Sequence, residues 1–456
     1  MGLLFDRLES FLKIKALGRP LGRPPAEVRV VIDSRKVAVG DVFVAITGEK
    51  HDGHAFIDRT LREKAALCIV NESWYWRVRP ETGVFLPVRD TVLAMLRLAE
   101  AWLLHLEVPV VAVTGSNGKT TTRALIAAVL RKKYAVYETQ GNYNNRIGLP
   151  LSVFEITPDH DIAVLEMGTN HFGEIDELTR IVHPSIAVVT NIGRGHLEFL
   201  KDKAGVLRAK MEILNGMGEG GLLVVNGDDP LLAKYRAPKG VQKLSVGFKG
   251  KGLVRGARLE TALGEGARFT ADNVPVTLTV PGEGAAIDAL LALAVGKLLD
   301  VSVREGARAL SRVTPPGDRM AVHTVRGATV LADCYNANPD SMANALRLLA
   351  KSSGTGRRVA VLGDMGELGA KSEGYHRETG RLAAQCGVQV LLTYGKLGAA
   401  IAKGARAAGL KDVHAFTDKA ALAGVIRASL RQGDTVLIKG SHSMHMEEIV
   451  QALLST

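Results

Sequence analysis

Residues 108–130 of the chain read VPVVAVTGSNGKTTTRALIAAVL. The apolar run that ends at Val113 predicts a buried strand, and the alanine- and leucine-rich run after Thr122 predicts a helix. Between them, Gly115 and Gly118 permit a tight turn, in which backbone N–H groups and the positive end of the helix converge on an anion. The stretch therefore predicts a phosphate-binding loop.

The side chains of this loop predict a nucleotide. Lys119 would reach the β- and γ-phosphates, and the Thr120 hydroxyl is placed to ligate Mg²⁺. Val113 stands where the commonest form of the motif has its first glycine, so this is the shorter T-G-x-x-G-K-T form, which supports nucleoside triphosphate binding without naming the reaction. The alternative is a glycine-rich turn with a solvated lysine. The other loop residues expected at the nucleotide are Gly115, Ser116, Asn117, Gly118 and Thr121.

The size, composition and charge of the chain limit the classes of protein to which it can belong. The 456 residues predict two to three domains, and 46% hydrophobic with 23% charged residues is typical of a soluble globular protein. The net charge of +11 comes without an aromatic-interleaved basic stripe. We therefore expect anionic small molecules rather than nucleic acid as partners.

Three cysteines, Cys68, Cys334 and Cys386, lie far apart and favour a reducing compartment without a zinc site. The N-terminus lacks an apolar signal core, and no apolar run approaches the ~20 residues that span a bilayer. We therefore expect a cytoplasmic protein without a membrane span.

Polar residues follow several predicted strands of the middle region. The predicted strand at 162–168 carries Glu166 near its end, and the loop after the predicted strand at 186–193 carries His196. Because the ends of parallel strands meet at one sheet edge, beside the phosphate loop, both are candidates to complete metal shells at the phosphates. Taken singly, each could be a capping carboxylate or a satisfied loop histidine. The amide-rich loop at 141–150, with Asn142 and Asn145, could hold a ligand through neutral hydrogen bonds.

At two other polar positions, the spacing is also explained by an ordinary structural role without a ligand. Asp33-Ser34-Arg35 could be a capped turn with a solvated arginine, or a site where Ser34 and Arg35 hold an anionic or uracil-bearing ligand. Lys210 lies on a predicted helix, and its spacing alone makes it an ordinary solvated lysine.

Alternating strands and helices predict an α/β protein with mainly parallel sheets covered on both faces. A helix at 91–106 precedes the phosphate loop, and residues 314–317, Thr-Pro-Pro-Gly, stop regular structure. We therefore predict domains at 1–106, 107–314 and 315–456.

Together these motifs resemble the ATP-dependent Mur ligases of peptidoglycan synthesis, and within them the MurF type. Among the matching segments, residues 333–342 and 361–369 favour that type over its siblings. The segments are residues 33–35, 40–45, 52–54, 114–121, 142–150, 166–168, 173–175, 191–198, 209–213, 333–342 and 361–369.

The resemblance implies three domains: one for a UDP-sugar, a central P-loop ATPase and a C-terminal Rossmann-like domain that closes over the site. It implies an enzyme, expected to be monomeric, that uses ATP and Mg²⁺ to join D-alanyl-D-alanine to UDP-N-acetylmuramoyl-tripeptide through an acyl phosphate. It also implies that Lys210 is carbamoylated and binds a second Mg²⁺. The residues it assigns to catalysis, metal or nucleotide are Lys119, Thr120, Glu166, His196, Lys210, Arg319, Asp333 and Asn336. Those it assigns to substrate are Ser34, Arg35, Asn142 and Asn145.

Three departures from the family pattern leave alternatives open. Residues 282–288 lack the His and first Asn with which the family helps to hold adenine, and Asp288 replaces the second Asn. One extra residue precedes Arg319, the position that matches the family's catalytic arginine. His442 replaces an arginine whose bidentate, permanently charged grip it cannot reproduce. A sibling ligase that adds a single amino acid and a nucleotide-binding homologue without turnover are the alternatives.

Overall fold

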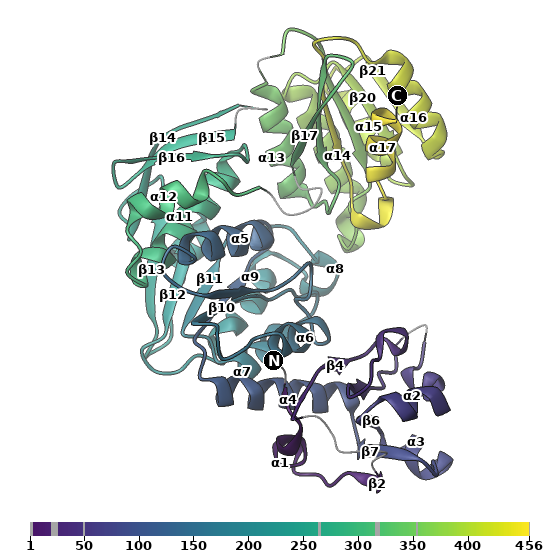
Figure 1. The fold of residues 1–456 in the computed structure, drawn as a ribbon. Coiled ribbons are helices and arrows are strands. Elements are labelled where there is room, and N and C mark those ends of the chain that lie inside the picture. Colours follow the sequence, from purple (N-terminus) through teal and green to yellow (C-terminus); the bar gives the residue numbers. More distant parts are fainter. Residues whose placement is uncertain are drawn as a thin grey trace.

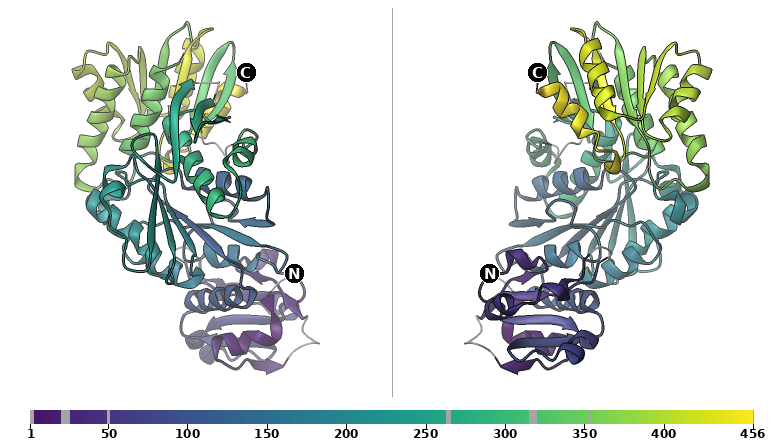
Figure 2. Two further views of the ribbon diagram at one scale, coloured as in Figure 1. Left: turned by 90° about the vertical axis from the view of Figure 1, so that its left-hand side faces the viewer. Right: turned by 90° about the vertical axis from the view of Figure 1, so that its right-hand side faces the viewer.

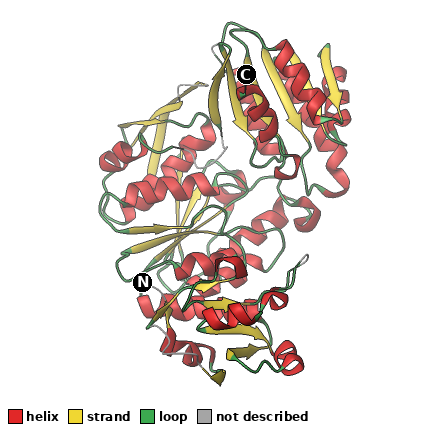
Figure 3. Ribbon diagram, turned by 45° about the vertical axis from the view of Figure 1, so that its right-hand side comes forward, coloured by secondary structure: helices red, strands yellow, loops and turns green. Residues whose placement is uncertain are grey.

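The computed structural model describes residues 3–19, 26–48, 51–262, 266–314, 320–352 and 354–455. Three α/β parts follow one another, with the N-terminal part at one end and the C-terminal part at the other (Figure 1). Side views and the colouring by secondary structure show helices on both faces of the central and C-terminal sheets (Figures 2 and 3). The predicted α/β class with mainly parallel sheets is confirmed.

The N-terminal part is built on a sheet with the strand order β2-β7-β6-β5-β4. Its strands run parallel except for β2, and a separate antiparallel pair joins β1 to β3. The strands are β1 (Leu3–Leu4), β2 (Leu17–Arg19), β3 (Glu27–Val28), β4 (Val30–Val31), β5 (Val42–Val44), β6 (Leu67–Asn71) and β7 (Gly83–Val88). The helices are η1 (Phe5–Arg7), α1 (Leu8–Leu12), η2 (Ser34–Lys36), η3 (Gly53–Phe56), α2 (Arg59–Lys64) and α3 (Glu72–Val78).

Helix α4 (Thr91–Leu106) joins the N-terminal and central parts and has the predicted bounds. It begins at Asp90, whose carboxylate accepts from the backbone N–H groups of Val92 and Leu93 and so caps two otherwise unpaired donors. Its buried face packs against α1 on one side and against α6 and α7 of the central part on the other. The helix therefore fixes where the first part sits against the second.

The central sheet has the order β16-β15-β14-β13-β12-β11-β8-β10-β9 in the described part of the chain. It is parallel from β9 to β14, and β14 to β16 add antiparallel strands at one edge. The strands are β8 (Val110–Thr114), β9 (Val136–Glu138), β10 (Ile162–Glu166), β11 (Ile186–Val189), β12 (Leu222–Asn226), β13 (Gln242–Gly247), β14 (Val254–Ala262), β15 (Gly266–Ala271) and β16 (Val274–Leu278). The helices are α5 (Lys119–Leu130), α6 (Gly148–Phe154), α7 (Glu174–Val182), α8 (Leu197–Leu200), α9 (Lys203–Met211), η4 (Glu212–Leu214), α10 (Pro230–Lys234), α11 (Glu283–Leu298) and α12 (Val303–Leu310).

Strand β8 lies in the middle of this sheet and is buried on both faces, which explains its continuous apolar sequence. Val111 and Val113 pack in the core that contains α5 and α11, whereas Val110 and Ala112 face the core that contains α4. The chain leaves β8 toward β9 and β10 on one side and returns to β11 on the other. The exit loops of β8, β10 and β11 therefore meet at a topological switch point, where ligands bind in open α/β sheets.

The C-terminal sheet has the order β17-β18-β22-β19-β20-β21, and only its edge strand β17 is antiparallel among the described strands. The strands are β17 (Ala321–Val325), β18 (Ala328–Asp333), β19 (Arg358–Gly363), β20 (Val390–Tyr394), β21 (Asp412–Phe416) and β22 (Thr435–Lys439). The helices are α13 (Pro339–Ala350), η5 (Gly369–Lys371), α14 (Ser372–Gln385), α15 (Gly398–Ala407), α16 (Lys419–Ser429), η6 (His442–Met444) and α17 (Glu447–Leu454). The predicted boundary at 314/315 borders the undescribed residues 315–319.

Across the described ranges, no helix combines the length and the apolar character that a bilayer crossing requires.

Candidate active site

A cavity of about 890 Å³ lies at the carboxyl edge of the central sheet and is closed from the other side by the C-terminal part. It brings together most of the residues that the sequence singled out. They are Ser116, Asn117, Gly118, Lys119, Thr121, Asn142, Asn145, Glu166, His196, Asp333 and Asn336. Thr120 and Lys210 are buried rather than lining the cavity. Arg319 lies outside the described residues.

The phosphate loop is held rigidly between β8 and α5. The Asn191 side chain accepts from the backbone N–H of Asn117 at 3.1 Å and donates to its carbonyl at 2.9 Å. Gly115 has φ +148° and Gly118 has φ +82°, and a Cβ at position 115 would lie 1.9 Å from the Thr190 hydroxyl. Both glycines are thus required by the turn and by its close packing. Lys119 begins α5, and its ammonium donates to the Gly115 carbonyl at 3.1 Å.

Glu166 ends β10 beside this loop and is only 2% exposed. One carboxylate oxygen accepts from the Asn144 amide at 2.8 Å, and the other lies 3.5 Å from the Arg123 guanidinium. Arg123 is itself 4% exposed; it donates to the Gly141 carbonyl at 3.1 Å and lies 3.6 Å from Glu138. The sequence interpretation missed both Arg123 and Asn144. Asn144 could have been found in the amide-rich loop, whereas Arg123 looks like an ordinary residue of an apolar helix.

The interpretation of Lys210 as an ordinary solvated lysine, drawn from its spacing, is wrong. The lysine is 1% exposed rather than solvated. Burial and the neighbouring charge of Lys119 lower the pKa of Lys210 well below its usual value, against the opposing influence of Glu174, Glu166 and Glu212. The helix pattern around α9 could not reveal this, because the burial comes from segments distant in the sequence. The neutral amine is therefore favoured at this position.

His196 has a left-handed backbone (φ 53°) at the start of α8. Its Nδ1 pairs with the carboxylate of Glu367 from the C-terminal part. The histidine holds the pKa of Glu367 below its usual value. The backbone N–H of Glu198 also donates to the Glu367 carbonyl at 3.0 Å. His196 thus sits where the two parts meet at the cavity.

Asp333 and Asn336 lie on the C-terminal side of the cavity, fixed by Lys439. The buried ammonium of Lys439 donates to the Asp333 carboxylate at 2.5 Å and to the Asn336 carbonyl at 2.8 Å. His442, which follows this lysine by three residues, has its ring 5.8 Å from that of Tyr335, a further cavity residue. An aromatic pair therefore occupies the region where the family pattern predicts an arginine.

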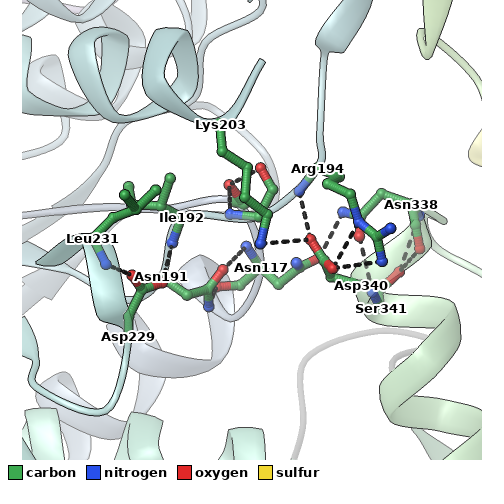
Figure 4. A network of polar contacts seen from close by, with 12 residues as sticks. Asn117, Asn191, Ile192, Arg194, Lys203, Asp229, Leu231, Asn338, Asp340 and Ser341 are labelled. Atoms are coloured by element: carbon green, nitrogen blue, oxygen red, sulfur yellow. Dashed lines mark hydrogen bonds and ion pairs between the residues drawn. The ribbon is translucent and has the colours of Figure 1, made fainter. Parts of the chain in front are cut away.

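A polar network joins the phosphate loop to the N-terminus of α13 (Figure 4). The Asn338 amide donates to the Asn117 side-chain oxygen at 2.8 Å. The backbone N–H and the Nε of Arg194 donate to the Asp340 carboxylate at 2.5 and 3.0 Å. Arg194 also donates to Glu378 at 2.9 Å. The C-terminal part is therefore docked directly on the phosphate loop and on the loop after β11.

Ser34 and Arg35 lie in the N-terminal part and do not line this cavity. The Asp33 carboxylate accepts from the backbone N–H of Arg35 and pairs with its guanidinium at 2.9 Å, while the arginine side chain stays 87% exposed. This pairing lowers the pKa of Asp33 to about 2. The capped turn of the sequence interpretation is present, and a ligand role for Ser34 and Arg35 stays a prediction.

The donor chemistry of the cavity, together with the buried Thr120 between its lining residues Lys119 and Thr121, fits magnesium. The described residues contain no cluster of three or more His, Cys, Asp or Glu side chains that could hold a metal by themselves. The Glu166 carboxylate and the Thr120 hydroxyl are hard oxygen donors, and Mg²⁺ commonly binds one or two such groups together with substrate phosphates.

The fold and this cavity define a three-part P-loop nucleotide-binding protein with its site between the central and C-terminal parts. Family models named "Mur ligase family, catalytic domain", "Mur ligase middle domain" and "Mur ligase, glutamate ligase domain" match residues 29–79, 113–296 and 318–442. The chain belongs to the Mur ligase family, within its MurF branch.

Individual relatives are similar to this chain in sequence and structure over nearly its whole length. The UDP-N-acetylmuramoyl-tripeptide–D-alanyl-D-alanine ligase of Bacillus subtilis is 37% identical over 433 residues, which cover 94% of this chain and 93% of the relative. A crystal structure of MurF from Acinetobacter baumannii superposes with a TM-score of 0.90 at 30% identity and covers 100% of this chain and 99% of that one. MurF from Thermotoga maritima in complex with ADP gives a TM-score of 0.84 at 29% identity, covering 94% and 97% of the two chains.

Proposed function

We propose that this chain is an ATP-dependent ligase that joins D-alanyl-D-alanine to UDP-N-acetylmuramoyl-tripeptide and releases ADP and phosphate. The observation that carries the proposal is the single cavity in which the phosphate loop with Lys119, the carboxylate of Glu166 and the Asp333–Asn336 segment face one another. The B. subtilis relative is named for the same reaction.

The charges in the cavity suit the first chemical step. A substrate carboxylate must attack the γ-phosphate of ATP, although both are anionic. Lys119 and the N–H groups at the start of α5 would hold the phosphates and offset that repulsion. Mg²⁺, held by Thr120 and Glu166, would neutralise further phosphate charge. The amine of D-alanyl-D-alanine then attacks the acyl phosphate, so that the amide bond forms as phosphate leaves.

Water must be kept from the acyl phosphate until the amine arrives. The contacts of Asn338, Asp340 and Glu367 close the C-terminal part over the phosphate loop and His196. This closure supports ligation over hydrolysis, because an excluded-water site protects a reactive intermediate.

Lys210 would contribute as a carbamate. Its lowered pKa leaves a neutral amine, which can add to CO₂ with loss of a proton and so turn a buried amine into an anionic oxygen ligand. Incubation with ¹³C-bicarbonate should give a carbamate carbon resonance that is absent from Lys210→Ala. The same spectrum in both proteins would show that Lys210 does not carry a carbamate.

We place the reaction in the cytoplasm, where ATP is available. The three cysteines are all free thiols, which supports a reducing compartment.

Phosphate release from ATP tests the function. The protein is given ATP and Mg²⁺ with UDP-N-acetylmuramoyl-tripeptide and D-alanyl-D-alanine, separately and together, and the amide product is followed by mass spectrometry. We expect release and product only with all substrates, and a loss of roughly 100-fold or more in Lys119→Ala. Product with a single amino acid in place of the dipeptide would identify a sibling ligase. ADP binding without phosphate release in any combination of substrates would identify a nucleotide-binding homologue without turnover.

A further inference from the structure

Helix α11 carries one acidic side chain in an otherwise apolar, buried stretch. From Ala285 to Gly296 every residue of the helix is buried, and Asp288 is the single charged residue among them. Asp288 is 5% exposed and lines the cavity that contains Lys119. A carboxyl group in such a setting has lost most of its hydration, which penalises the ionised form.

The Asp288 carboxyl packs directly on the phosphate loop. A Cβ built at Gly118 would lie 2.6 and 2.7 Å from its two oxygens, so this glycine is required by Asp288 as well as by its own φ of +82°. One turn further along α5, the buried hydroxyl of Thr122 interacts with the carboxyl and makes no hydrogen bond of standard geometry to any described residue. Asp288 therefore lies against the phosphate loop and forms part of the cavity wall beside it.

Within the described ranges, no charged side chain contributes to the pKa of this carboxyl. Helix α11 packs against α5, α12 and strands β12 to β15. Lys119 at the start of α5 and Glu283 at the start of α11 are charged and line the same cavity, yet burial and Thr122 alone determine the pKa of Asp288, which rises to about 8. No described backbone N–H donates to it either, so the positive end of α5 stays available to a ligand.

We propose that Asp288 is a nucleotide-binding residue that acts as an uncharged carboxylic acid, so that this site binds ADP and ATP with Asp288 protonated. The inference rests on the proposed function only in taking the phosphate loop to bind a nucleotide. An ionised Asp288 would repel the phosphates and compete with them for the positive end of α5. A protonated Asp288 instead presents an O–H donor, as an asparagine amide would present an N–H donor.

The proposal predicts that nucleotide affinity depends on pH in a specific way. Because the nucleotide favours the protonated form, affinity is constant below the pKa of Asp288 and falls about tenfold per pH unit above it. The nucleotide itself does not titrate in this window, since its terminal phosphate ionises near pH 6.

Calorimetric titration of the full-length protein with ADP and Mg²⁺ between pH 7.0 and 9.5 tests the proposal. Wild-type affinity should fall on the order of tenfold or more across this range beyond any loss seen in D288N, where an amide cannot ionise. The matched control is E283Q, which removes an exposed acid five residues earlier on the same helix and should keep the wild-type pH profile. Identical profiles for wild type and D288N would overturn the proposal.

A second measurement needs no variant. At pH 8.5 to 9, ADP binding to the wild type should take up a proton, detected as a different apparent heat in two buffers of different ionisation enthalpy. No proton uptake would overturn the proposal. ADP that binds with a flat pH profile overturns this inference alone, whereas a failure of ADP to bind at pH 7 overturns the nucleotide site and the proposed function with it.

Discussion

Arg123 is a buried cation beside the carboxylate of Glu166. It lies between Glu138 and Glu166 on neighbouring strands and holds the carbonyl of Gly141 at the start of the amide-rich loop. Arg123→Met keeps the length of the side chain but leaves the buried Glu166 carboxylate without its arginine and Glu138 with Arg131 alone. Breaking a buried ion pair commonly costs about 3–5 kcal/mol. We expect a lower melting temperature, a roughly 10- to 100-fold fall in kcat and a higher Mg²⁺ requirement.

Arg131→Met is the matched control. Arg131 binds the other oxygen of the same Glu138 at 3.0 Å, but its side chain is 46% exposed, and exposed pairs contribute about 0–1 kcal/mol. Steady-state kinetics against Mg²⁺ and the stabilisation of each protein by Mg²⁺-ADP separate the two variants. Equal, small effects of both substitutions would show that Arg123 does not position Glu166. Partial recovery in Arg123→Lys is the expected sign of a charge effect.

At the scale of the element, the N-terminus of α13 has two functions that a single substitution can separate. The Asn338 oxygen caps the helix by accepting from the Ser341 N–H at 2.9 Å, and its amide donates to Asn117 of the phosphate loop at 2.8 Å. Asn338→Ser keeps a capping oxygen but loses the contact with Asn117. We expect an almost unchanged melting temperature and a fall in kcat of about fivefold, the equivalent of one hydrogen bond of about 1 kcal/mol.

Thermal unfolding and steady-state kinetics of Asn338→Ser and Asn338→Ala measure the two functions. Asn338→Ala should lose the cap as well and lower the melting temperature. The idea of a contact that aligns the phosphate loop fails if Asn338→Ser retains wild-type kcat.

Local signals in the sequence predicted single elements well. Helix α4 has the predicted bounds because Asp90 caps it and its apolar period is regular, and β8 and α5 follow from an apolar run, two glycines and a lysine. The burial of Lys210 and Arg123 was not predicted, because their surroundings include distant parts of the chain. Arg123 lies beside Glu138 and Glu166, and the charges of Glu174 and Glu166 act on Lys210. The ion pairs of Arg194 also join residues about 150 or more positions apart, beyond any local pattern.

At the scale of the whole molecule, Arg194 joins the central part to two helices of the C-terminal part. Its guanidinium lies between Asp340 of α13 and Glu378 of α14 and stacks over the Tyr375 ring at 5.4 Å (Figure 4 shows the Asp340 side). The same Asp340 carboxylate lies within 3.8 Å of Lys203. This cluster is half-exposed at its edge. Its polar contacts hold the C-terminal part against the central part, in the closed arrangement that protection of the acyl phosphate requires.

Reversing the charge at this position should open the molecule without removing any residue of the cavity. In Arg194→Glu, the new carboxylate faces Asp340 and Glu378, so the closed arrangement is destabilised while the phosphate loop remains intact. We expect ADP to bind with little change, and phosphate release per amide formed to rise above one, because water then reaches the acyl phosphate. Small-angle scattering should show a larger radius of gyration. The double variant Arg194→Glu/Glu378→Arg restores an attractive pair and should bring the ratio back toward one. A ratio that stays at one in Arg194→Glu, with wild-type scattering, would mean that closure does not depend on Arg194.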